Sequence, residues 1–60
     1  MNPWQGKATV YQTIHPNRPG RVLFNDTPWK ARAQNGQTIP SGATVEVCDR
    51  QGIELIVKLF

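Results

Sequence analysis

The residues of this chain that could act as nucleophile, general base or metal ligand are few, and no spacing gathers them. The 60 residues offer one histidine, His15, one cysteine, Cys48, and Ser41 in a Pro-Ser-Gly sequence. A hydrolase needs a nucleophile beside a general base, and we interpret His15 and Ser41 as loop residues because each adjoins a proline. A single thiol can build neither an internal disulfide nor a thiolate zinc site. We therefore expect no catalytic residue, no metal and no cofactor.

Charged side chains are the other chemistry that the chain carries. Seven lysines and arginines against four aspartates and glutamates give a net charge of +3, and such a surface can attract nucleic acid or anionic lipid. The basic residues form no run, however, and we interpret most of them as a solvated surface. The carboxylates fall in expected turns or on the outer face of the last hairpin, where ion pairs such as Glu46 with Lys58 explain them.

A chain of this length has room for one thin core and no enclosed active site, because small domains bury a smaller share of their surface. We expect a single domain over residues 1–60, with residues 1–5 as a loose N-terminal segment. No apolar run approaches the roughly 18 residues that cross a bilayer, and the N-terminus lacks the apolar stretch of a secretory signal. These features predict a cytoplasmic chain without a transmembrane segment.

Glycine and proline recur too often for a long helix, and the segments between them alternate apolar and polar residues as strands do. In the last hairpin, Thr44–Cys48 and Ile53–Leu59 flank a three-residue loop, Arg50–Gly52, in which Gly52 takes a left-handed conformation. The register that sorts apolar from polar side chains pairs Asp49 with Ile53, Val47 with Leu55, Val45 with Val57 and Ala43 with Leu59.

A second hairpin is predicted from Gly20–Phe24 and Thr27–Ala33 around Asn25-Asp26, since both of these residues tolerate the positive φ of a two-residue turn. This turn sets Gly20 against Ala31, Val22 against Trp29, and Leu23 against Pro28. A four-residue loop through Pro28 keeps the same faces, and the sequence does not choose between the two.

Together with a first strand within Lys7–Ile14, these hairpins predict an all-β, five-stranded, OB-like barrel without an inserted helix. We expect Trp29 to fill its small core, because an indole buries a large apolar area. Gln34–Gly42 is a polar loop with a turn at Asn35-Gly36, and Ile39 returns from it to close the barrel end. The predicted inner side chains are Ala8, Val10, Ile14, Val22, Phe24, Trp29, Ala31, Ala33, Val45, Val47, Ile53, Leu55, Val57 and Leu59.

The packing pattern also resembles a known family. It consists of Gly20-x-Val22-x-Phe24, Trp29-x-Ala31-x-Ala33, Ile39-x-x-Gly42-x-x-Val45-x-Val47 and Gly52-x-x-Leu55-x-Val57. Over roughly residues 6–59 this string resembles the C-terminal domain of NfeD-like proteins, which are five-stranded OB-like barrels. The resemblance implies a small non-catalytic adaptor that binds a protein. It also implies a membrane-associated partner, because such domains are commonly the soluble part of membrane proteins that associate with stomatin- or prohibitin-like scaffolds. The serine protease domain of long members is not matched, so no protease activity is carried over.

Two outer surfaces are candidates for binding. The first is a protein-contact patch whose apolar members point outward by strand parity and whose cations flank them, and it is equally suited to self-association: Leu23, Ile56, Phe60, Arg21 and Lys58. The second is a face for single-stranded nucleic acid, which OB barrels often bind across strands two and three: Arg21, Lys30, Arg32 and Tyr11. We favour protein binding, because Phe24 and Trp29 are expected inside and stacking bases needs exposed aromatic rings.

Overall fold

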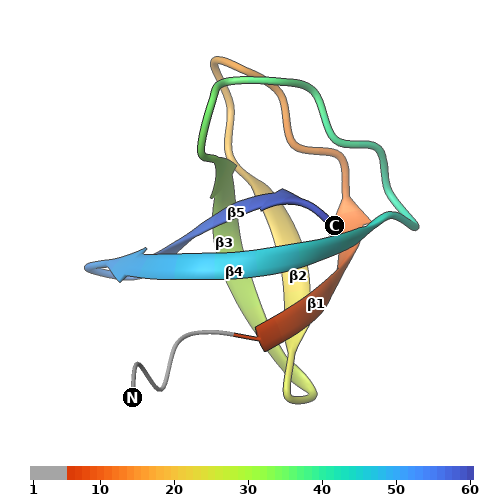
Figure 1. The fold of residues 1–60 in the computed structure, drawn as a ribbon, viewed down its shortest axis with the longest axis vertical. Coiled ribbons are helices and arrows are strands. Elements are labelled where there is room, and N and C mark those ends of the chain that lie inside the picture. The colour runs from red at the N-terminus through yellow and green to blue at the C-terminus, as the bar shows by residue number, and fades with distance from the viewer. Residues whose placement is uncertain (1–5) are drawn as a thin grey trace.

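Residues 6–60, which the computed structural model describes, form five strands that close into a barrel (Figure 1). The strands are β1 (Gly6–Gln12), β2 (Gly20–Phe24), β3 (Thr27–Ala33), β4 (Thr44–Gln51) and β5 (Glu54–Leu59). They follow one another around the barrel in the order β1-β2-β3-β5-β4, with β4 pairing back onto β1. The β3–β5 pair is parallel and the others are antiparallel. Within residues 6–60 there is no helix, so the predicted all-β, OB-like barrel is confirmed, whereas the expectation for residues 1–5 lies outside the described residues.

The two long connections lie together at one end of the barrel, and the β2–β3 turn lies at the opposite end (Figure 1). Ile14 and Ile39 join the long connections by mutual backbone hydrogen bonds of 2.8 and 2.9 Å, and both side chains are fully buried. Ile39 therefore returns from its loop into the core, as predicted. The turn at Gly36 is also present, with a φ of 72° that a glycine adopts without strain.

The β2–β3 hairpin has the register that the sequence predicts. Val22 lies opposite Trp29 and Leu23 opposite Pro28. Asn25 and Asp26 have φ values of 52° and 64°, the positive values that a two-residue type I′ turn requires. The structure thus selects the two-residue turn over the four-residue loop through Pro28.

The β4–β5 hairpin differs from the prediction. Val47 lies opposite Val57 rather than Leu55, and Val45 lies opposite Leu59 rather than Val57. The strands meet in a two-residue turn at Gly52-Ile53, where Gly52 has the predicted left-handed φ of 61°, while Arg50 and Gln51 belong to β4. Between the Val47–Val57 and Asp49–Ile56 pairs, β4 has one residue more than β5, and this residue forms a bulge between Val47 and Asp49. The predicted register and loop are therefore wrong, although the sorting of faces is preserved.

Most of the predicted inner side chains are buried, and three are not. Ile53, which the shorter turn moves to the hairpin tip, is 70% exposed, and Leu59, at the end of β5, is 47% exposed. Trp29 is half-buried at the margin of the core instead of filling it. The buried apolar set comprises Ala8, Val10, Ile14, Val22, Phe24, Ala31, Ala33, Ile39, Val45, Val47, Leu55 and Val57.

Candidate partner-binding surface

The interior of the barrel holds apolar side chains. The three residues considered as nucleophile, general base or metal ligand lie outside this interior. His15 lines a shallow surface hollow in the β1–β2 connection, together with Pro16, Asn17 and Arg18. Ser41 lies in the β3–β4 connection, where its backbone N–H donates to the Thr13 hydroxyl at 3.3 Å. Cys48 lies in the β4 bulge, with its Sγ 3.7 Å from Oε1 of Gln34. Among residues 6–60 no group of three His, Cys, Asp or Glu side chains gathers where it could hold a metal ion. The side chains of residues 6–60 that could contact a ligand or a partner therefore lie on the outer surface of the barrel.

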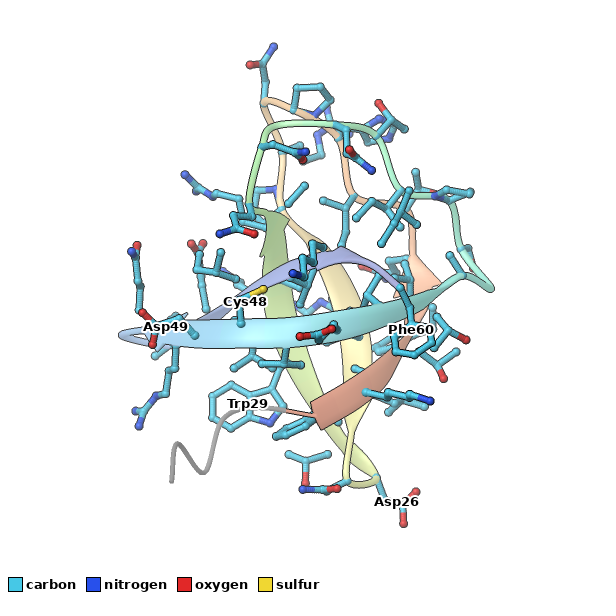
Figure 2. The ribbon with its side chains drawn as sticks, viewed as in Figure 1. Asp26, Trp29, Cys48, Asp49 and Phe60 are labelled. Carbon is cyan, nitrogen blue, oxygen red and sulfur yellow. The ribbon has the colours of Figure 1, made fainter. Side chains whose placement is uncertain are left out.

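Phe60 is the most prominent apolar side chain next to β1. Its backbone N–H donates to the Thr44 carbonyl at 3.3 Å, which holds the residue beside β4, and its side chain is 70% exposed (Figure 2). The Nζ of Lys7, on β1, lies 4.1 Å from the centroid of the Phe60 ring. An ammonium group at this distance from an aromatic face is attracted by the ring electrons, so the contact links the end of β5 to β1.

Leu23 lies on the other side of β1. It is opposite Thr9 on β1, and Thr9 is in turn opposite Thr44 on β4. The alternating burial of β1 and β2 points Leu23 and Thr9 outward, and Leu23 is 42% exposed. An outward row therefore runs Leu23, Thr9, Thr44 and Phe60 across neighbouring strands.

Tyr11 and Arg21 complete this surface. Tyr11 lies two residues beyond Thr9 in a bulge of β1 and is 38% exposed, and Arg21 lies two residues before Leu23 on β2 and is also exposed. We call the outward side chains that surround Thr9 the β1 face: Lys7, Thr9, Tyr11, Arg21, Leu23 and Phe60. The face brings together three exposed apolar side chains and two cations, which is the mixture that protein contacts use.

Ile56, which the sequence groups with Leu23 and Phe60, lies away from the β1 face on β5, whereas Lys58 lies two residues before Phe60. Ile56 is half-buried between Arg32 on β3 and Asp49 on β4. Lys58 lies opposite Glu46, which separates it from Lys7 on β1. Arg21 and Leu23 therefore lie beside β1, Lys58 and Phe60 lie two residues apart across β4 from β1, and Ile56 lies between β3 and β4.

The predicted nucleic-acid residues lie on neighbouring strands, and Arg32 is two residues from Lys30 on the same outward side of β3. Arg21 lies opposite Lys30, and Tyr11 lies at the adjoining part of β1. Arg32 points outward on β3 toward Glu54, with 3.5 Å between its Nη2 and the Oε1 of Glu54. Phe24 is buried, as expected, so it offers no ring to a base.

The sequence does not predict the contact between Trp29 and the β4–β5 turn. The guanidinium of Arg50 lies 5.8 Å from the centroid of the indole, and its Nε donates to the Gly52 carbonyl at 2.7 Å. Ile53 lies in the same turn, and Figure 2 places Trp29 below β4. The missed signal is the Gly-Ile pair itself, because a glycine at the first central position suits a two-residue type II′ turn and would have exposed Ile53.

The fold is a small closed barrel with an apolar core and exposed apolar and basic side chains. Comparison with known proteins identifies its family. The model of the NfeD-like C-terminal, partner-binding domain matches residues 5–58. The chain therefore belongs to the NfeD-like C-terminal domain family, and its function is that of a partner-binding domain. None of the curated proteins matches it.

Two solved structures are similar to this chain over almost its whole length. One is the C-terminal domain of a stomatin operon partner protein from Pyrococcus horikoshii, with a TM-score of 0.83 and 31% identity over 90% of this chain and 81% of that one. The other is the soluble domain of a membrane protein implicated in regulation of membrane protease activity, from Corynebacterium glutamicum. It has a TM-score of 0.82 and 29% identity over 93% of this chain and 90% of that one. Residues 6–60 of the present chain include no helix of the length and hydropathy that a membrane span requires.

Proposed function

We propose that this domain is a non-catalytic adaptor that binds a stomatin- or prohibitin-like membrane scaffold through the β1 face. The observation that carries the proposal is the exposure of Leu23, Tyr11 and Phe60 around one strand of a barrel whose interior is filled. A similar domain belongs to a stomatin operon partner protein, which supports the choice of scaffold. On this proposal the domain acts in the cytoplasm and reaches the membrane through its partner.

The strand pairings favour contact through side chains rather than through an added strand. A partner peptide can extend a sheet only where an edge leaves backbone groups unpaired. Each of the strands of residues 6–60 has a neighbour on both sides, so a partner meets the outward side chains instead. Tyr11 and Arg21 would supply most of the binding energy, because tyrosine and arginine side chains are enriched among the residues that dominate such contacts.

The test measures the affinity of the domain for a stomatin-like protein of the same organism by biolayer interferometry. Leu23→Glu places a charge on the β1 face at an exposed position, and we expect it to abolish capture while the circular dichroism spectrum is retained. Thr38→Glu makes a comparable change at an exposed position in the β3–β4 connection and should bind as the natural domain does. Equal binding by the two variants would refute the β1 face as the contact surface.

A further inference from the structure

Arg21 and Lys30 are like charges that face each other across β2 and β3. They are directly opposite in the strand register, and both side chains are exposed. Like charges in this position destabilise a sheet, so the pair is unfavourable to the barrel itself. An anion bound between the two cations would relieve their repulsion.

The carboxylate nearest this pair is shared with a third cation. On the β1 side Arg21 is followed by Gln12, an uncharged residue. On the β5 side Lys30 lies opposite Glu54, and that carboxylate is engaged by Arg32 at 3.5 Å. By contrast, Lys7 and Lys58 both lie opposite Glu46. Arg21 and Lys30 therefore face each other with one nearby carboxylate, which Arg32 also engages.

An apolar site adjoins the two cations. Leu23 follows Arg21 by two residues on the same outward side of β2, and its cross-strand neighbour is Pro28 on β3. A ligand that covers this area meets two positive groups and, next to them, an aliphatic side chain and a proline ring. We propose that the pair binds carboxylates of an acidic segment of the protein partner, while an apolar side chain of that segment packs on Leu23. This proposal rests on the proposed function, and it specifies the chemistry of the partner.

Two other anionic ligands fit the surface less well. Single-stranded nucleic acid is held by several aromatic rings on which successive bases stack. Tyr11 offers one ring beside Arg21, but the positions between the cations and the hairpin turn hold Leu23 and Pro28, and Phe24 is buried. Segments that bind anionic membranes carry clusters of roughly four to eight basic residues, whereas Arg21 and Lys30 have only Arg32 beside them on β3, and Arg32 engages Glu54. Charge and apolar surface together favour an acidic protein segment.

The test is fluorescence anisotropy with a labelled peptide in which leucines are spaced among glutamates, at low and high salt. We expect binding at low salt that Arg21→Glu weakens by about ten- to a hundredfold, with a similar loss for Lys30→Glu. Lys58→Glu changes the net charge equally at a position on β5 four residues beyond Glu54, the residue opposite Lys30, and it should alter the affinity less than about threefold. Arg21→Glu also places a carboxylate opposite Lys30, so its thermal stability should not fall, which separates a binding role from a structural one.

Several results would overturn the acidic-segment proposal: no binding of the acidic peptide at low salt, tighter binding of an oligothymidine or of phosphatidylserine vesicles, or equal losses for Arg21→Glu and Lys58→Glu. A second arm uses the stomatin-like protein. If it binds and Arg21→Glu leaves its affinity unchanged, the acidic-segment proposal fails while partner binding stands. If it does not bind but the acidic peptide does, the choice of scaffold fails and the acidic-segment proposal stands.

Discussion

The ammonium group of Lys7 lies over the ring of Phe60, 4.1 Å from its centroid, and so joins the first strand of the barrel to the residue that follows the last. We expect this contact to stabilise the barrel modestly, because an exposed cation–π pair contributes about 0.5–1 kcal/mol. A double-mutant cycle with Lys7→Gln and Phe60→Leu, measured by urea unfolding, should give a coupling energy of that size. Strictly additive effects would mean that the two side chains do not interact in solution.

Gly20 should be irreplaceable for a steric reason. A Cβ built at this position would lie 2.3 Å from the carbonyl oxygen of Gln12 and 2.7 Å from the Ile14 side chain. Since the first of these groups is backbone, Gly20→Ala must displace β1 and should cost at least about 2–3 kcal/mol, at the upper end of overpacking effects. Gly36→Ala meets nothing within 4 Å and should cost only the roughly 1 kcal/mol of a left-handed alanine. Chemical unfolding of both variants checks the difference, and similar costs would contradict the close approach at Gly20.

Asp26→Gly should stabilise the domain. Asp26 has a φ of 64° in the type I′ turn, a conformation that glycine adopts without steric cost, and Asn-Gly is the preferred sequence for this turn. We expect a gain of about 0.5–1 kcal/mol. Thermal unfolding measures it directly, and a loss of stability would argue against the two-residue turn.

The contrast between the two hairpins explains how much of the fold can be predicted from the sequence. Asn25-Asp26 selects one turn, and that turn fixes the β2–β3 register from Gly20 to Phe24. The turn signal of β4–β5 is weaker, because Gly52-Ile53 suits a two-residue turn but a three-residue loop that ends at Gly52 also keeps the alternating pattern. A slip of one residue would exchange the two faces of a strand, but a shift of two restores them, so the apolar pattern cannot distinguish Val47 opposite Leu55 from Val47 opposite Val57. The two-residue turn at Gly52-Ile53 and the bulge in β4 together set the observed register.

Strand parity alone also does not predict which outward side chains of the binding surface lie together. Strand parity points Leu23 and Ile56 outward, but only the closed strand order separates them, with Leu23 between β1 and β3 and Ile56 between β3 and β4. The exposure of Ile53 could not be predicted from the expected register, because it follows from the shorter turn. Parity therefore identifies the outward side chains, whereas their grouping requires the pairing of distant strands.

Trp29 should contribute less to stability than its size suggests. It is half-buried at the margin of the core, whereas Leu55 is fully buried. Leu55→Ala should cost about 2–5 kcal/mol, and Trp29→Ala should cost less than the 3–5 kcal/mol typical of a buried aromatic residue. Urea unfolding of the two variants gives the order. If Trp29→Ala fails to fold while Leu55→Ala folds, the indole is a central part of the core and this prediction is wrong.

The central claim is that the domain meets its partner through the β1 face. The most direct test is cross-saturation NMR of the isotope-labelled domain bound to a stomatin-like protein. We predict that signal loss concentrates at Thr9, Tyr11 and Leu23, with little at Arg32 on β3 and Ile56 on β5. Loss centred on Ile56 and its neighbours, with the β1 face unaffected, would contradict the claim.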